Sequence, residues 1–207
     1  MHREIKEEGQ GHIFENSFLE PLTKSPPYIS AIIYTLAVIT LLVIGWQMQV
    51  VNSFWVGGLI YFGAIFFWTF FEYFAHRYLF HIDEYFPNSK IASKLAYTFH
   101  GIHHEYPRDK DRIIMPPVPG LMIIALLYGF FLLLLGNYAY IFMPGFVTGY
   151  LLYTRIHYLT HTPPVPSFLK SQYRHHSLHH YKYPEKAFGI STTLWDRIFG
   201  TMPPADA

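Results

Sequence analysis

Charged side chains are missing from two long stretches of this 207-residue chain. The first stretch lies between Lys24 and Glu72, and the second lies between Arg112 and Arg155. Each is long enough for two helices of about 20 apolar residues, the length that crosses a bilayer. A short polar or glycine-containing break divides each stretch. The pattern therefore predicts four membrane spans, over residues 28–47, 54–74, 118–136 and 138–157.

The interior of these stretches shows no helical alternation of apolar and polar positions. Residues 31–44 and 121–135 are almost wholly apolar, whereas the helices of a soluble bundle each need a polar stripe. The prolines ahead of the first and third spans suit the first turn of a helix, where proline is tolerated. We therefore expect an all-α integral membrane protein in which residues 1–207 form a single domain.

Four spans place the N-terminal segment, the loop over residues 76–119 and the C-terminal tail on one side of the membrane. All 15 Lys and Arg residues fall in these three segments, when Arg155 at the cytoplasmic end of the fourth span is counted with the tail. Segments rich in Lys and Arg next to a span stay in the cytoplasm. We therefore expect a multi-pass protein with both termini cytoplasmic, in a bacterial inner membrane or the endoplasmic reticulum.

Composition narrows the possible chemistry and partners. The chain contains no cysteine, which excludes disulfides, thiolate metal sites and cysteine nucleophiles. Its net charge is only +1 and it carries no basic block, so we expect no nucleic-acid partner. The residue type that stands out is histidine, with 13 copies.

Eleven of the histidines fall in four groups, all at or beyond the cytoplasmic ends of the predicted spans, and only His2 and His12 lie elsewhere. The groups are His76 with His81, His100 with His103 and His104, His157 with His161, and His175 with His176, His179 and His180. Residues at i, i+3 and i+4 share one face of a helix, so each H-x-x-H-H sequence predicts three converging rings. The rings of His76 and His81 diverge by about 140° on an ideal helix. That pair suits either a helix end or two different metal ions.

These groups supply ten imidazoles when His175 is set aside, too many for one structural zinc ion with four ligands. Two ions with about five imidazoles each would leave a position for water or oxygen. A single histidine near a membrane is more often an anchor than a ligand, but anchors have no reason to repeat H-x-x-H-H. We therefore expect a cytoplasmic histidine-rich cap that holds a dinuclear metal site. His175 is ambiguous and could support a ligand from outside the set.

The residues around the histidines form extended motifs over positions 14–26, 72–81, 100–117, 179–181, 188–191 and 194–201. These motifs resemble the fatty acid hydroxylase superfamily, most closely the fatty acid 2-hydroxylases that act on sphingolipid acyl chains. The resemblance implies O₂-dependent hydroxylation of a lipid acyl chain next to its carbonyl, with no catalytic residue assigned beyond the metal ligands. It also implies two iron ions, for which zinc can substitute in a purified protein. The implied ligands are His76, His81, His100, His103, His104, His157, His161, His176, His179 and His180.

The chain departs from this family in two places. The family commonly has an aspartate after the tyrosine that leads into the third histidine pair, and here Tyr153 is followed by Thr154. A carboxylate that supports the ligands is then lost, which bears on metal tuning or substrate choice. Eukaryotic members often carry an N-terminal b-type cytochrome module, for which residues 1–27 are too short. We therefore expect electrons from a separate protein, a b-type cytochrome or a ferredoxin with its reductase.

Other functions compete with this one on sequence alone. Hydroxylation or desaturation of a sterol, carotenoid or sphingoid base uses the same histidine count. A metal transporter would place ionisable groups near the middle of its spans, and these spans hold none there. A purely structural zinc protein would need fewer ligands and no open position.

Three carboxylates near the histidines each have two interpretations. Glu72 lies one turn before His76 and either accepts a hydrogen bond from its ring or only ends the charge-free stretch. For Asp109 and Asp196 we expect ion pairs with nearby arginines rather than contacts that orient histidines. The aromatic run over residues 66–71 is expected to face lipid or to pack, not to line a substrate site.

Overall fold

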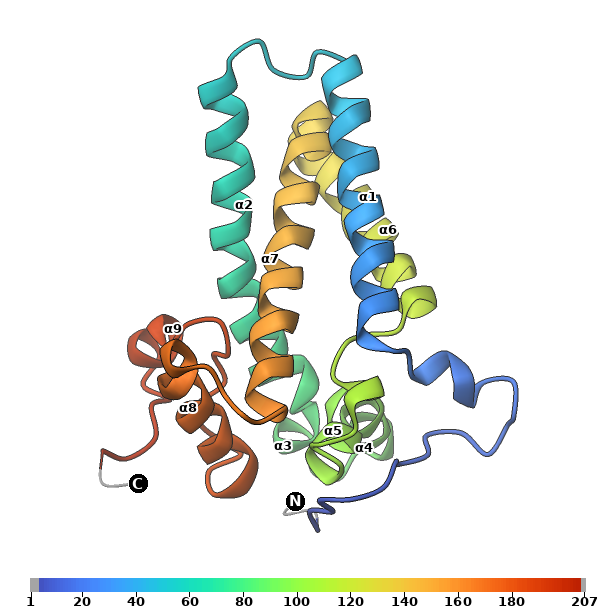
Figure 1. The fold of residues 1–207 in the computed structure, drawn as a ribbon, viewed down its shortest axis with the longest axis vertical. Coiled ribbons are helices and arrows are strands. Elements are labelled where there is room, and N and C mark those ends of the chain that lie inside the picture. The colour runs from blue at the N-terminus through green and yellow to red at the C-terminus, as the bar shows by residue number, and fades with distance from the viewer. Residues whose placement is uncertain (1–3, 206–207) are drawn as a thin grey trace.

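The computed structural model describes residues 4–205, so His2 and Arg3 lie outside the described part. Every regular element within that part is helical. Four long helices stand side by side and form what we call the stem (Figure 1). They are α1 (Pro27–Gln47), α2 (Phe54–Phe74), α6 (Pro117–Leu135) and α7 (Ala139–His161). Apart from the short connections that follow α1 and α6, the remaining chain gathers at one end of the stem, and we call it the cap.

Within residues 4–205, three helical stretches are long and apolar enough to cross a membrane, namely Pro27–Gln47, Phe54–Phe80 and Lys110–His161. The third contains both α6 and α7, which η5 (Gly136–Tyr138) separates. Gly136 has a φ of +56°, a left-handed conformation that glycine adopts without a steric penalty. The all-α class is confirmed. The helix ends agree with the predicted spans within one residue, except that α7 continues beyond residue 157 to His161.

Helix α7 is the central helix of the stem and contacts α1, α2 and α6, most extensively α2. A Cβ atom on Gly145 would lie 2.3 Å from the carbonyl oxygen of Tyr61. A Cβ atom on Gly149 would lie 2.5 Å from Cβ of Trp68. Small residues let two helices approach this closely in apolar surroundings. The contact brings the cap-side ends of α2 and α7 into the cap beside each other.

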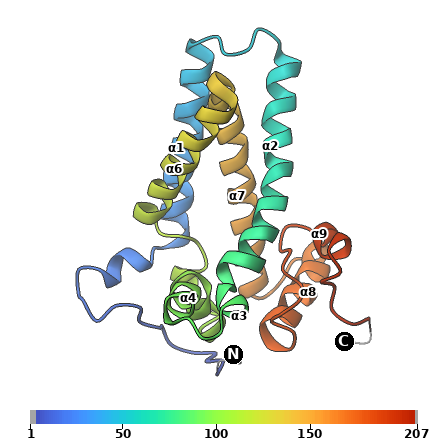
Figure 2. The same cartoon turned by 180° about the vertical axis from the view of Figure 1, so that it is seen from behind.

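The cap is built from short helices in three segments of the chain. The first segment contains η1 (Glu20–Thr23). The second contains η2 (Ala75–Phe80), α3 (Ile82–Tyr85), α4 (Lys90–Ala96), η3 (Tyr97–Gly101), α5 (Ile102–Glu105) and η4 (Lys110–Arg112). The third contains η6 (Ser167–Leu169), α8 (Lys170–Tyr181) and α9 (Leu194–Ile198). Helix α8 carries His175 to His180. Figure 2, the view from behind, shows α8 and α9 near the cap-side end of α2, and α9 contacts α2 directly.

The N-terminal segment, residues 4–26, runs along the cap and is anchored by a buried ion pair. The carboxylate of Glu20 pairs with the guanidinium of Arg112, and both side chains are less than a tenth exposed. Arg112 also donates hydrogen bonds to the carbonyl of Gly11 at 2.8 Å and to the hydroxyl of Thr23 at 2.7 Å. These contacts hold two segments that are far apart in the sequence together in the cap.

Candidate metal centre

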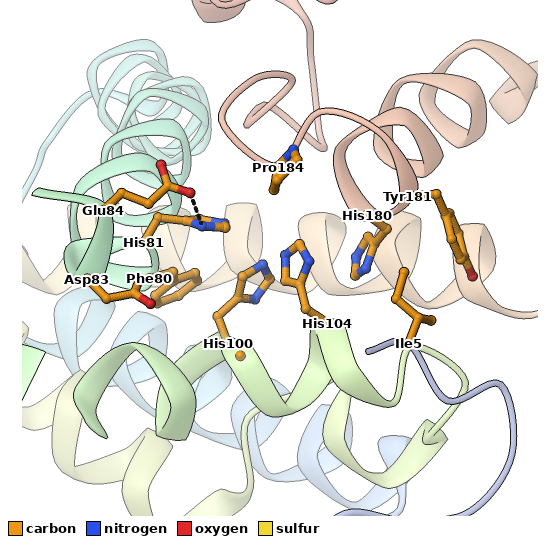
Figure 3. A pocket seen from close by; sticks show the side chains of 11 residues that line it. Ile5, Phe80, His81, Asp83, Glu84, His100, His104, His180, Tyr181 and Pro184 are labelled. Carbon is orange, nitrogen blue, oxygen red and sulfur yellow. Dashed lines mark ion pairs between the residues drawn. The ribbon is translucent and has the colours of Figure 1, made fainter. Parts of the chain in front are cut away.

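The ten histidines assigned from the sequence lie in two groups of five in the cap. Within each group, one ring nitrogen of every histidine lies within 4.8 Å of those of the other four. The first histidine group contains His76, His81, His100, His104 and His179, and the second contains His103, His157, His161, His176 and His180. The groups are neighbours, because the ring of His104 stacks on that of His180 with centroids 4.2 Å apart (Figure 3).

His76 and His81 reach the same group because α2 continues into a π-helix at its cap-side end. The π-helix η2 spans Ala75–Phe80. Its i to i+5 hydrogen bonds widen the turn, so residues five apart come to lie on one face. The predicted divergence of about 140° assumed an ideal α-helix and is wrong here. The two ring centroids are 5.4 Å apart.

Each H-x-x-H-H sequence divides its rings between the two groups. The division is His100 and His104 against His103, and His176 and His180 against His179. Rings at i and i+4 stay together, whereas the ring at i+3 turns to the other group. The prediction that all three rings of a sequence converge is therefore wrong, and each sequence connects both groups.

The two groups are built to the same plan. Each receives one pair from the end of a stem helix, one i, i+4 pair from an H-x-x-H-H sequence, and a single ring from the other H-x-x-H-H sequence. The stem pairs are His76 with His81 at the end of α2, and His157 with His161 in the last turns of α7. Neither group is complete until both H-x-x-H-H sequences are in place.

The spacing of the ring nitrogens fits a metal ion in each group. The Nε2 atom of His161 lies 3.1 Å from that of His103, 3.1 Å from that of His157 and 2.8 Å from that of His176. One imidazole nitrogen carries at most one hydrogen, so hydrogen bonds alone cannot satisfy such a cluster. Metal–imidazole bonds of about 2.0–2.1 Å would put adjacent donors about 3.0 Å apart and opposite donors about 4.2 Å apart. The three observed spacings match the value for adjacent donors.

Burial keeps six of the ten histidines neutral, which is the form that binds metal. It lowers the pKa of these side chains well below the ordinary value of about 6.5, and neighbouring imidazoles lower the pKa further. This applies to His100, His103, His104, His176, His179 and His180.

The two groups differ in the hydrogen-bond partners of the Nδ1 atoms of their rings. In the first group, Nδ1 of His76 donates to the carbonyl of Phe188 at 2.6 Å, and Nδ1 of His179 donates to the carbonyl of Lys186 at 2.7 Å. Such bonds leave the Nε2 lone pair free for a metal. In the second group, four buried Nδ1 atoms have no hydrogen-bond partner among residues 4–205. They belong to His103, His157, His176 and His180.

Glu72, near the end of α2, bonds to the C-terminal tail rather than to His76. Its Oε1 atom accepts hydrogen bonds from the backbone amides of Ile190 at 2.7 Å and Ser191 at 2.8 Å. The hydroxyl of Ser191 donates to Oε2. Neither role expected for Glu72 describes this contact, in which the carboxylate joins a stem helix to the tail.

Asp196, on α9, binds the two backbone amides of the tail that precede those bound by Glu72. It accepts hydrogen bonds from the backbone amides of Phe188 at 2.9 Å and Gly189 at 2.8 Å, and it lies 3.1 Å from Nε2 of His175. Burial alone would raise the pKa of Asp196, but hydrogen bonds led by the one from His175 hold it below its ordinary value. The expected ion pair with an arginine is wrong for Asp196. His175, outside both groups, is held by this carboxylate.

The other two polar residues singled out from the sequence have simpler surroundings. Asp109 forms the expected ion pair, with Oδ2 lying 3.2 Å from Nε of Arg112. Thr154 is buried, and its hydroxyl donates to the carbonyl of Leu151 on the same helix at 2.9 Å. The hydroxyl of Thr154 is therefore occupied one turn before His157.

A cavity of about 70 Å³ lies beside the first group (Figure 3). His81, His100, His104 and His180 line it together with Ile5, Phe80, Asp83, Glu84, Gly101, Tyr181 and Pro184. A water molecule takes about 30 Å³ of liquid volume. By the measure used for this cavity one water needs about 10–15 Å³, so the cavity has room for several water molecules or for dioxygen.

Sequence reasoning missed the groups that support the first histidine group. The carbonyls of Lys186 and Phe188 belong to the backbone, so no residue type reveals them. Glu84 lies 3.4 Å from Nδ1 of His81, and its only signal is the i, i+3 spacing. In the sequence, the motif over residues 188–191 indicates a family resemblance but no physical role.

Comparisons with known proteins agree on the kind of protein that this chain resembles. The fatty acid hydroxylase family model matches residues 61–201. Ceramide very long chain fatty acid hydroxylase scs7 of Schizosaccharomyces pombe is 37% identical, over 98% of this chain and 58% of its own length. Fatty acid 2-hydroxylase of Mus musculus is 42% identical, over 72% of this chain and 41% of its own length. A solved structure of full-length scs7p, in which only the hydroxylase domain is visible, matches with a TM-score of 0.84 at 33% identity, covering 94% of this chain and 72% of that one.

Proposed function

The chain belongs to the fatty acid hydroxylase family, and we propose that it is a membrane-bound di-iron monooxygenase that hydroxylates a lipid acyl chain next to its carbonyl. The observation that carries this proposal is the pair of five-imidazole groups at one end of an apolar stem. The chain spans about half the length of the curated relatives that it matches. Their names, which include ceramide fatty acid hydroxylases and fatty acid 2-hydroxylases, support an acyl substrate.

We further propose that all four stem helices cross the membrane and that both termini and the cap are cytoplasmic. The helices α6 and α7 have 19 and 23 residues, each close to the length of a span. The histidine pairs begin where α2 and α7 enter the cap, at the depth of lipid headgroups. An acyl carbon close to the headgroup is therefore the one within reach, which favours attack next to the carbonyl.

Iron ions in the two groups would supply the reductive activation of dioxygen, a redox chemistry that zinc lacks. Hydroxylation places one oxygen atom in a C–H bond and reduces the other to water, which consumes two electrons and two protons. The chain contributes the ten imidazoles that would hold the ions. It also buries them in the cap, where the surrounding side chains keep bulk water away.

We propose that the two electrons come from a separate carrier, a b-type cytochrome or a ferredoxin with its reductase. Iron-loaded protein given dioxygen alone should then turn over poorly, and addition of a carrier, its reductase and NAD(P)H should restore turnover. The measurement is hydroxylated product formed per chain. Sustained turnover without any donor would contradict this part of the proposal.

Mass spectrometry of lipids from cells with and without the protein tests the reaction itself. We expect 2-hydroxy acyl chains in sphingolipids, and their loss in a His161→Ala variant that is still inserted in the membrane. A hydroxylated sterol, carotenoid or sphingoid base, or a new double bond, would instead assign the sister chemistry. Unchanged lipids in cells whose protein binds metal would leave a metal-binding role and overturn the enzyme.

A further inference from the structure

Four consecutive backbone amides in the tail donate to two buried carboxylates. Those of Phe188 and Gly189 donate to Asp196, and the next two, of residues 190 and 191, donate to Glu72, all at 2.7–2.9 Å. Glu72 comes from a stem helix and Asp196 from the last cap helix, so residues 186–191 are fixed from both sides. We call residues 186–191, together with these two carboxylates, the clamp.

Two backbone carbonyls of the clamp accept hydrogen bonds from histidines, and both histidines belong to the first group. The carbonyls of Lys186 and Phe188 accept the Nδ1 hydrogens of His179 and His76, both of the first group. A fixed hydrogen bond on one ring nitrogen sets the tautomer and the orientation of the ring, which pre-organises the other nitrogen for metal. The ring of Phe188, almost fully buried, also packs against His76 with centroids 5.6 Å apart.

The second histidine group has no counterpart of the clamp within residues 4–205. The Nδ1 atoms of four of its five rings are buried without a hydrogen-bond partner. Thr154, one turn before His157 on the same helix, cannot serve as such a partner, because its hydroxyl is bonded to its own helix backbone. Rings without such a partner must be ordered when a metal binds, which lowers the affinity of the group.

We propose that the two histidine groups bind metal with unequal affinity, the first more tightly, and that Glu72 and Asp196 are the positioning residues that produce the difference. This inference rests on the proposed function only in that both groups bind metal. Hydrogen-bond partners of metal ligands typically change metal affinity by about 10–100-fold. We therefore expect the affinities of the two groups to differ by a factor in that range.

Graded chelation of the zinc-loaded protein tests the inequality. Purified protein in detergent is loaded with Zn²⁺ to two ions per chain and exposed to increasing EDTA, and the metal retained is measured by mass spectrometry. We expect two steps, separated by about 10–100-fold in chelator. Release of both ions in a single step would overturn the inequality. Loading of less than two ions would instead overturn the proposed dinuclear function, so the two failures are distinguishable.

Variants of the clamp then test its cause. In Asp196→Asn, the tighter ion should be released at a lower EDTA concentration, closer to the one that releases the weaker ion. The EDTA concentration that releases the weaker ion should not change. Glu72→Gln keeps an acceptor oxygen, so it should narrow the difference in EDTA concentration between the two release steps less than Glu72→Ala does. The control is Asp109→Asn, which removes a buried carboxylate of the cap that lies outside the clamp and should leave the gap intact. A merely structural loss of stability would shift both steps together, and that outcome would contradict a positioning role.

A second route avoids changing either carboxylate, should Asp196→Asn fail to accumulate. A Cβ atom on Gly189 would lie 2.2 Å from the carbonyl oxygen of Thr192 and 2.7 Å from Oδ2 of Asp196. Gly189→Ala should therefore displace the clamp and weaken the tighter step alone. If Gly189→Ala releases its ions in the same two steps as the original protein, the clamp does not set the affinity of the first group.

Discussion

In the stem, α7 lies against α2 through glycines and aromatic rings, whereas in the cap the chain is held by buried carboxylates, an arginine and ten imidazoles. Apart from a hydrogen bond between the hydroxyls of Tyr61 and Thr148, the contacts between these two helices depend on shape. The cap contacts are polar and directional, and each has a particular partner atom. Substitutions in the stem should therefore act through packing volume, and substitutions in the cap should act through lost partners and lost metal.

The largest effect is expected for the histidines of the cap. His103→Ala removes a ring of the second group and His179→Ala removes a ring of the first. Because losing even a partner of a ligand costs about 10–100-fold in affinity or activity, each variant should lose at least that much. Metal content and hydroxylation measure the loss, and membrane insertion should be unchanged because the stem is untouched. Activity and metal content equal to those of the original protein would show that these two rings do not hold metal.

The next largest effect is expected for Arg112, whose side chain is 2% exposed. Arg112→Met leaves the carboxylates of Glu20 and Asp109 buried without their cation, and breaking a buried ion pair costs about 3–5 kcal/mol. The N-terminal segment should then detach from the cap. Limited proteolysis at residues 4–26 would detect the release, and unchanged protection would show that the ion pair is not what anchors the segment.

The same anchor should respond to acid. Burial alone would raise the pKa of Glu20, but two backbone amides and Arg112 hold it below its ordinary value. A carboxyl whose pKa is lowered by folding contributes stability above its unfolded pKa of about 4.3 and loses it as the pH falls. Protection of the N-terminal segment should be constant from about pH 8 to pH 5 and fall below about pH 4. Burial raises the pKa of Asp109, which gives that carboxyl a pH dependence of the opposite sign. The loss of protection in acid should therefore disappear in Glu20→Gln.

A smaller effect is expected in the stem. Gly145→Ala would bring Cβ to 2.3 Å from the carbonyl oxygen of Tyr61, so α2 and α7 must separate. Overpacking of this kind costs about 1–3 kcal/mol. Gly129→Ala, on α6, is the matched control, because its Cβ would have no atom within 4 Å. Thermal unfolding in detergent should separate the two, and equal melting temperatures would refute the close approach of α2 and α7.

The smallest effect is expected for His12, a cap histidine outside both groups. Its side chain is 73% exposed, and its Nδ1 atom lies 3.4 Å from Oε1 of Glu20. An exposed pair of this kind contributes little. His12→Ala should leave metal content and activity unchanged and alter stability by no more than about 0.5 kcal/mol. A loss of metal in this variant would show that the two groups do not hold all the ions.

The stem could be predicted almost to the residue, because charge-free stretches of fixed length have few other structures available. The cap could be predicted only as a set of residue types. The face-sharing rule for His76 and His81 assumed 3.6 residues per turn, and the π-helix η2 changes that period. No periodicity in the sequence marks a π-helix.

The division of each H-x-x-H-H sequence was also hidden, for a different reason. Residues at i, i+3 and i+4 share a face, but a face is wide enough for two ions. Which ring turns to which ion depends on the facing helix. Asp196 shows the same limit, because its partners are backbone amides whose position follows from the whole tail.

The interleaving of the two H-x-x-H-H sequences gives the metal ions a role as cross-links. The chain has no cysteine, so no disulfide joins its segments. Each ion would tie together three segments far apart in the sequence, and two segments would be shared by both ions. Closing such long loops lowers the entropy of the unfolded chain, as a disulfide does, and makes metal-binding energy part of the folding energy. A protein stripped of metal would then lose more than catalysis, because the cap would open to proteases while the stem kept its own packing.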